Sequence, residues 1–93
     1  MRITYDPAKR AETLEHRNLD FEDAPKLFAE TNFQMEDDRR DYGETRWISV
    51  GRLDRDIVVV VWTLRDDARR IISMRKCHGK ERKAYLARLD RSG

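Results

Sequence analysis

The apolar run at residues 57–62 constrains the fold of this chain more than any other feature. It reads Ile-Val-Val-Val-Val-Trp, so every position is apolar and nearly all are β-branched. β-Branched residues favour strands, and a run without alternation suits a strand that is buried on both faces of a sheet. The run is far shorter than the roughly 20 apolar residues of a membrane-spanning helix. We therefore predict that residues 57–64 form the central strand.

A second segment, residues 69–76, follows the short polar turn Asp66-Asp67, and its polar and apolar residues alternate. We expect it to pair with the central strand and to present Arg75 and Lys76 at its end, as a rigid cationic platform. Simple strand alternation divides its side chains into two sets, with Arg69, Ile71, Ser73 and Arg75 on one side and Arg70, Ile72 and Met74 on the other.

The N-terminal helices are predicted from their capping residues. Asp6 is a suitable N-cap and Pro7 suits the first helical position, so a helix should begin there and end near Asn18. Asp20 caps a second helix. Because proline removes a backbone donor, Pro25 should distort the first turn of that helix or delay its start.

The remaining segments complete the predicted fold. Residues 2–5 and 33–36 alternate weakly and residues 45–51 alternate clearly, which favours three further strands. Gly79 precedes a last helix. The fold class is therefore α+β, a small antiparallel β-sheet meander with two N-terminal helices and one C-terminal helix, in a single domain over residues 1–93.

The charges of this chain are distributed unevenly along it. Residues 1–45 hold seven Lys or Arg and twelve Asp or Glu, whereas residues 46–93 hold thirteen and six. Most of the basic excess lies in residues 69–91, where nine cations face only Glu81 and Asp90. Such a patch suits a polyanion, RNA or DNA, that is contacted through its phosphates. A solvated basic face is the alternative interpretation.

The rarer residue types exclude several classes of function. The single cysteine, Cys77, rules out an internal disulfide framework, and no apolar signal segment opens the chain, so we expect a cytoplasmic protein. The sequence contains no P-loop, dinucleotide fingerprint, nucleophile elbow or metal motif, and we expect no metal or cofactor. Cys77 lies beside His78, but neighbouring strand residues point to opposite faces, which argues against a thiol nucleophile.

Several polar residues fit the cleavage of RNA through its own 2′-hydroxyl group. That reaction needs an acceptor for the hydroxyl proton, cations on the phosphate and a proton for the leaving 5′-oxygen. Arg75 and Lys76 supply charge, Tyr85 or an arginine suits proton transfer, and Glu44 or a histidine suits the base. Glu44 with Arg46 also fits a simple strand-edge ion pair, and Tyr85 also fits a core position.

Five ordered segments carry a resemblance over nearly the whole chain. They are residues 5–9 (Tyr-Asp-Pro-Ala-Lys), 19–24 (Leu-Asp-Phe-Glu-Asp-Ala), 41–46 (Asp-Tyr-Gly-Glu-Thr-Arg), 58–63 (Val-Val-Val-Val-Trp-Thr) and 70–76 (Arg-Ile-Ile-Ser-Met-Arg-Lys), followed by Glu81 and Tyr85. In this order they resemble the BrnT family, ribonuclease toxins of bacterial type II toxin–antitoxin pairs, related in fold to RelE.

The resemblance implies a RelE-like endoribonuclease that inhibits translation and is neutralised by a BrnA-type antitoxin. It also implies contact with operator DNA only through the antitoxin, and a toxin dimer within that complex is a further expectation. The polar positions that match the family are Lys9, Glu44, Arg46, Ser73, Arg75, Lys76, Glu81 and Tyr85. The catalytic candidates are Arg75, Glu44, Arg46 and Tyr85, and the RNA-binding candidates are Lys9, Ser73, Lys76, Lys80 and Lys83.

Two non-catalytic functions also fit the sequence. One is an RNA-binding or antitoxin-binding module without cleavage activity, and the other is a structural partner inside a DNA-binding autorepressor complex. A neighbouring gene for a small ribbon-helix-helix protein would favour the toxin-related functions. Growth arrest on expression without that neighbour would separate a toxin from a passive partner.

The basic segment generates the first testable prediction. If residues 69–91 bind RNA through phosphates, the affinity should fall steeply with salt, by about 0.7 in the log–log slope for each phosphate neutralised on a single strand. Fluorescence anisotropy over a salt series measures that slope. A slope near zero would contradict phosphate binding by this segment.

Overall fold

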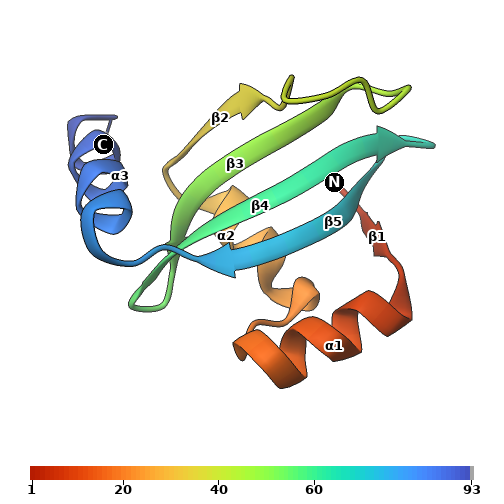
Figure 1. Ribbon diagram of the computed structural model, residues 1–93, viewed down its shortest axis with the longest axis horizontal. Coiled ribbons are helices and arrows are strands. Elements are labelled where there is room, and N and C mark those ends of the chain that lie inside the picture. Colours follow the sequence, from red (N-terminus) through yellow and green to blue (C-terminus); the bar gives the residue numbers. More distant parts are fainter. Residues whose placement is uncertain (93) are drawn as a thin grey trace.

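The computed structural model describes residues 1–92 and builds one five-stranded sheet in the order β1-β5-β4-β3-β2 (Figure 1). Gly93, the last residue of the predicted domain, lies outside the described residues. The strands are β1 (Ile3–Tyr5), β2 (Asn32–Glu36), β3 (Arg46–Leu53), β4 (Asp56–Arg65) and β5 (Ala68–Lys76). The α+β class is confirmed, and β4 occupies the centre of the sheet as predicted.

The prediction of an entirely antiparallel meander is wrong, because the sheet is mixed. Strands β2 to β5 pair antiparallel in sequence order, whereas β1 pairs parallel with the start of β5, with Ile3 opposite Arg69 and Tyr5 opposite Ile71. A strand of three residues followed by a long connection has no hairpin turn to fix its direction. Its alternation therefore predicted a strand but not the neighbour with which that strand pairs.

Helices α1 (Pro7–Arg17), α2 (Ala24–Ala29) and α3 (Gly79–Ser92) complete the fold, together with the 3₁₀ turn η1 (Phe21–Asp23). Asp6 caps α1 by accepting from the Ala8 amide, and Asn18 ends it with φ of 55°. The second helix has the distorted, delayed start that Pro25 predicts: Asp20 caps the 3₁₀ turn η1, and the six-residue α2 follows with Pro25 in its first turn. None of the helices in residues 1–92 has the length and apolar character needed to cross a membrane.

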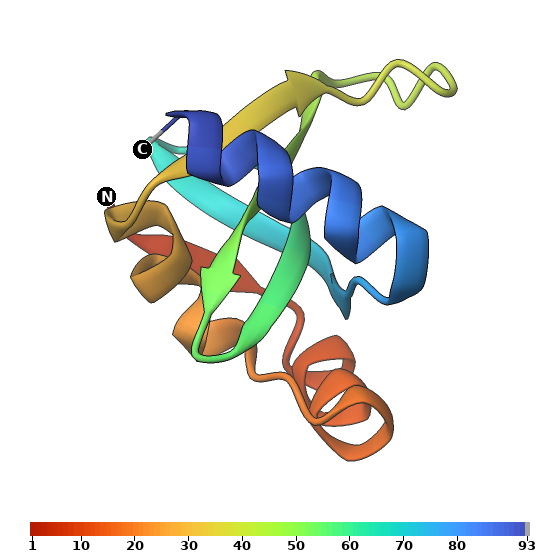
Figure 2. The same cartoon turned by 90° about the vertical axis from the view of Figure 1, so that its left-hand side faces the viewer.

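The sheet is covered on both faces, and β4 contributes to both cores. Figure 2 shows α3 on one side of the sheet and α1 and α2 on the other. On the α1–α2 side, Val58, Val60 and Trp62 pack in a core that also contains Phe21 and Leu27. On the α3 side, the core contains Phe33, Val50, Ile57, Val59 and Leu89. The apolar run is therefore buried on both faces, as its sequence predicts.

A β-bulge in β5 changes which side chains share a face. Val61 lies opposite Ser73 and Trp62 lies opposite Ile71, so Ile72 has no partner on β4. Ile71 and Met74 consequently both enter the core on the α1–α2 side. The predicted division of this strand is therefore wrong beyond Ile71, because a bulge reverses the facing of every later residue.

The bulge predicts which apolar residues of β5 matter for stability. Ile71→Ala and Met74→Ala should each cost about 2–5 kcal/mol, because both side chains are almost fully buried. Ile72→Ala should cost about 1 kcal/mol, because Ile72 is only half-buried. Urea denaturation of the three variants measures the costs. Equal costs for Ile72→Ala and Met74→Ala would contradict the bulge.

Candidate functional site

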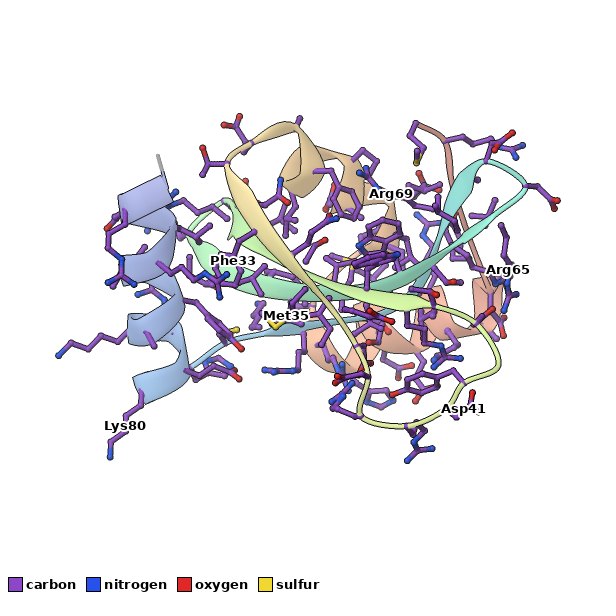
Figure 3. The ribbon with its side chains drawn as sticks, turned by 90° about the horizontal axis from the view of Figure 1, so that it is seen from above. Phe33, Met35, Asp41, Arg65, Arg69 and Lys80 are labelled. Carbon is purple, nitrogen blue, oxygen red and sulfur yellow. The ribbon has the colours of Figure 1, made fainter. Side chains whose placement is uncertain are left out.

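A groove of about 440 Å³ lies on the α3 side of the sheet, beside the helix. α3 packs over this face at Phe33, Val50, Ile57 and Val59, and the groove lies beyond it, where Met35, Ile48 and Val61 line the sheet. Figure 3 shows Phe33 against α3 and Met35 farther along β2, toward the loop that carries Asp41. The residues that line the groove are Arg17, Met35, Arg39, Ile48, Val59, Val61, Ser73, Arg75 and Tyr85.

The groove has an apolar floor and cationic edges. Met35, Ile48, Val59 and Val61 come from three neighbouring strands, and they form a surface on which a planar apolar group can lie. The three arginines come from α1, the β2–β3 loop and β5, so they surround the floor from different elements. A floor of this kind with guanidinium groups at its edges suits a ligand that has both flat rings and negative charges.

Arg75 is held at the groove by Glu81. Its guanidinium donates to both Glu81 carboxylate oxygens, at 2.6 and 3.0 Å, from the end of β5 to the first turn of α3. This pair raises the pKa of Arg75 and lowers the pKa of Glu81. Tyr85 follows Glu81 by four residues, which places both on one face of α3, and its ring packs edge-on against Phe33 at 5.5 Å.

Arg17 reaches the groove from the end of α1. It donates to the Met74 carbonyl oxygen at 2.8 Å, where the β1 edge of β5 is open because β1 pairs only as far as Ile71. The side chain thus satisfies a strand-edge acceptor and brings a cation beside Ser73 and Arg75. Arg17 therefore has a structural role and also contributes positive charge to the groove.

Arg39 reaches the groove from the loop between β2 and β3, through Asp37. The Asp37 side chain is only 1% exposed and accepts from Arg39 Nε at 2.7 Å and Nη2 at 2.8 Å. The Tyr42 hydroxyl donates to the same carboxylate at 3.1 Å. These donors, Arg39 first, lower the pKa of Asp37 to about 2. The buried carboxylate stays ionised and fixes the loop.

Glu44 and Arg46 lie in a different cluster. Glu44 accepts from Arg65 at 3.1 Å and from Arg46 at 3.3 Å, and these two partners lower the pKa of its carboxyl group. Arg46 also stacks on the Tyr42 ring, with its guanidinium carbon 4.0 Å from the ring centroid. Glu44 lines an acidic hollow of about 500 Å³ rather than the groove. Arg46 precedes Ile48 by two residues on β3, so it faces the groove side of the sheet.

The predicted RNA-binding residues are spread over several surfaces. Ser73 lines the groove, and Lys9 shares a neighbouring hollow of about 260 Å³ with it. Lys76 lies 3.5 Å from Asp56 and lines a further hollow that it shares with Arg75. Lys80 and Lys83 are exposed on α3. The groove brings together Ser73, Arg75 and Tyr85, whereas Lys9 and Lys76 line hollows next to it, and Lys80, Lys83 and Glu44 do not line it.

Sequence reasoning did not select Arg17 and Arg39. Arg17 lies at the end of a predicted helix and Arg39 lies in a predicted charged loop. Neither residue therefore belongs to a periodic sequence pattern that would mark it as part of a site. The Asp37-x-Arg39 spacing was the available signal, but it gains meaning only once Asp37 is known to be buried.

Burial raises the pKa of Cys77 to about 11, which argues against a thiolate nucleophile. Within residues 1–92, no His, Cys, Asp or Glu cluster is arranged to hold a metal ion.

The chain matches a known protein family over most of its length. Residues 5–81 match the family model described as "Ribonuclease toxin, BrnT, of type II toxin-antitoxin system". No curated protein matches the chain. The match includes the three arginines of the groove and Glu81, and it ends before Tyr85.

The buried carboxylate of Asp37 predicts a pH-dependent contribution to stability. Because its pKa falls from 3.8 to about 2 on folding, the contribution is full above about pH 4 and disappears as the pH falls through 2. Asp37→Asn should cost about 1 kcal/mol at pH 7, after screening of the exposed Arg39 partner is allowed for, and much less at pH 2. Urea denaturation at both pH values measures this, with the exposed neighbour Asp38→Asn as control. A cost that does not change with pH would contradict the assignment.

Proposed function

Because the chain belongs to the BrnT family of ribonuclease toxins of type II toxin–antitoxin systems, we propose that it is an endoribonuclease that cleaves RNA in the groove beside α3. The observation that carries this proposal is the set of arginines around an apolar floor, with Arg75 rigidly placed at the end of β5. RNA offers both of the features that this groove suits, flat bases and phosphates. We also propose a RelE-like fold in a single domain over residues 1–93.

The proposed reaction uses the 2′-hydroxyl group of the substrate as the nucleophile. Its oxygen forms a bond to phosphorus while its proton passes to a base, and the bond between phosphorus and the 5′-oxygen breaks. The products are a 2′,3′-cyclic phosphate and a 5′-hydroxyl group, which takes its proton from an acid. Guanidinium groups stabilise the charge that develops on the phosphate oxygens, so the proposed mechanism is independent of metal ions.

Arg75, Glu81 and Tyr85 carry the proposed chemistry. The substrate phosphate takes the place of Glu81 on Arg75, because both are anions that suit the planar guanidinium fork. Glu81 then loses the partner that lowers its pKa and becomes a better acceptor for the 2′-hydroxyl proton. The Tyr85 hydroxyl, one turn further along α3, donates the proton to the 5′-oxygen. Water restores both groups after product release.

Glu44 and Arg46 have a supporting role in this proposal. Glu44 is held by Arg65 and Arg46 outside the groove, which favours Glu81 as the proton acceptor. Arg46 faces the groove side of the sheet and can meet a phosphate beyond the floor. Ser73 contacts the substrate beside Arg75. Lys9, Lys76, Lys80 and Lys83 attract RNA to the surface from outside the groove.

The type II family implies an antitoxin protein as partner. We propose that this antitoxin is of the BrnA type, that cleavage of RNA inhibits translation, and that the antitoxin neutralises the toxin. In the same proposal the complex contacts operator DNA only through the antitoxin, and two toxin chains can be present in it. Antitoxin binding to the folded toxin would also stabilise a chain of this size by mass action.

Replacement of Arg75 tests the proposed function. Arg75→Ala should reduce RNA cleavage by about 10²–10³-fold, by analogy with the loss of an oxyanion donor. Arg75→Lys should restore only part of the activity, because an ammonium group lacks the planar fork. Cleavage of a labelled RNA, with and without EDTA, measures both effects, and wild-type activity should persist in EDTA.

The matched control is Arg55→Ala, which removes the same charge from an exposed position in the turn between β3 and β4, outside the groove and the basic segment. It should leave cleavage within about twofold of the wild-type rate. Thermal melting should show that every variant is folded. A folded Arg75→Ala protein with full activity would remove Arg75 from the mechanism, and RNA binding without any cleavage by the wild type would favour a non-catalytic binding module.

A further inference from the structure

We infer that single-stranded RNA crosses the sheet from β5 to the β2–β3 loop, with Arg39 as a second phosphate-binding residue that Asp37 positions. This inference rests on the proposed function and names how the same groove takes its substrate. It adds a loop residue to the site and specifies that the bound RNA runs across the β-strands and not along them.

The first support is that Arg39 is held in place although it is exposed. Its side chain is 68% exposed and lines the groove. At the same time its Nε and Nη2 both donate to the buried carboxylate of Asp37. An exposed arginine normally pays rotamer entropy when it binds an anion. Here Asp37 has already fixed the guanidinium group, and the remaining N–H groups are left to face a ligand.

The second support is the way Asp37 itself is fixed. Its backbone amide donates to the Arg46 carbonyl oxygen at 2.8 Å, which closes the base of the loop. Its carboxylate also accepts from the Tyr42 hydroxyl and, at 3.3 Å, from the Arg39 amide. Tyr42 in turn carries Arg46 on its ring. The loop is thus tied to β3 at several points, and Arg39 does not depend on a free segment for its position.

The third support is the distance across the sheet. β5 and β2 are separated by β4 and β3, so three strand spacings, roughly 14 Å, lie between them. The register partners Ser73, Val61, Ile48 and Met35 form a row across these four strands, which begins beside Arg75 on β5 and ends on β2, toward Arg39. At the stacked spacing that a strand has in a duplex, about 3.4 Å per nucleotide, up to about four nucleotides fit along this row. The apolar floor of Met35, Ile48 and Val61 lies under this path and offers a surface for the intervening bases.

A path parallel to the β-strands is less favourable for bound RNA than a path across them. At one end of the groove α3 covers Phe33 and Val59, against which its own Leu89 packs. At the other end lies the acidic hollow with Glu44, whose charge repels phosphate. The path across the strands follows the floor from Ser73 to Met35, with Arg75 beside its β5 end and Arg39 beside its β2 end, so it meets a cation at both ends. The positions of the cations and the shape of the groove therefore both favour an RNA path across the β-strands.

A length series of uncleavable RNA tests the inference. The probes are 2′-O-methyl oligonucleotides of two to six nucleotides, and their dissociation constants are measured by fluorescence anisotropy. Wild-type affinity should rise about tenfold between two and five nucleotides as the strand reaches Arg39. Arg39→Ala should remove this gain and reduce the salt slope of the longer probes by about 0.7.

Two further variants separate the effect of holding Arg39 in position from the effect of net charge on RNA binding. Arg40→Ala removes a cation from the same loop, but Arg40 lines the acidic hollow and not the groove, so the gain with length should persist. Asp37→Asn makes the protein more positive, so a purely electrostatic effect would strengthen binding. Positioning predicts the opposite, a loss of about threefold or more for the longer probes, with Arg39 still charged.

The outcomes distinguish this inference from the proposed function. Loss of binding in Arg75→Ala with a normal length series in Arg39→Ala would overturn the role of Arg39 and leave the groove in place. Unchanged or stronger binding by Asp37→Asn would overturn its positioning role. If neither arginine affected binding, or if a short acidic peptide bound where RNA did not, the proposed function itself would be wrong.

Discussion

The rest of the structure depends on the burial of β4 on both faces. Its valines alternate between two cores, one shared with η1 and α2 and one shared with α3. Because both cores are built on this strand, neither group of helices packs without it, and a chain of 93 residues has little other apolar surface to bury. The sheet that results is rigid, and the helix on one face covers only part of it. That uncovered part is the groove.

The groove owes its charge to a small change in register. The bulge at Ile72 places Met74 in the core and turns Ser73 and Arg75 toward the open face. Each groove arginine then has a fixed acceptor from another part of the fold: a carboxylate of α3, a buried carboxylate of the loop, or a strand-edge carbonyl. These partners hold cations in place before any substrate arrives, which reduces the entropy lost on binding. A phosphate needs only to compete with Glu81 at Arg75.

Local sequence patterns predicted the fold class, the central strand and the caps of α1. They also grouped Arg75 and Tyr85, which the structure places in the same groove. They failed where the outcome depends on pairing between distant segments. The parallel pairing of β1 is a choice of partner and direction, and the bulge at Ile72 is a change of register. Alternation within one strand contains no information on either. Arg17 and Arg39 were missed for the same reason, because each reaches the groove only through a contact made by folding.

The central claim is that RNA binds in the groove and not over the basic surface at large. NMR titration with an RNA that carries a single 2′-deoxy group at the cleaved position tests this most directly. If RNA binds in the groove, the backbone amide signals of Ile48, Val61 and Ser73 should shift together on binding, while those of Phe21 and Leu27 on the opposite face stay constant. Shifts confined to the exposed face of α3, with the signals of the groove unchanged, would contradict it.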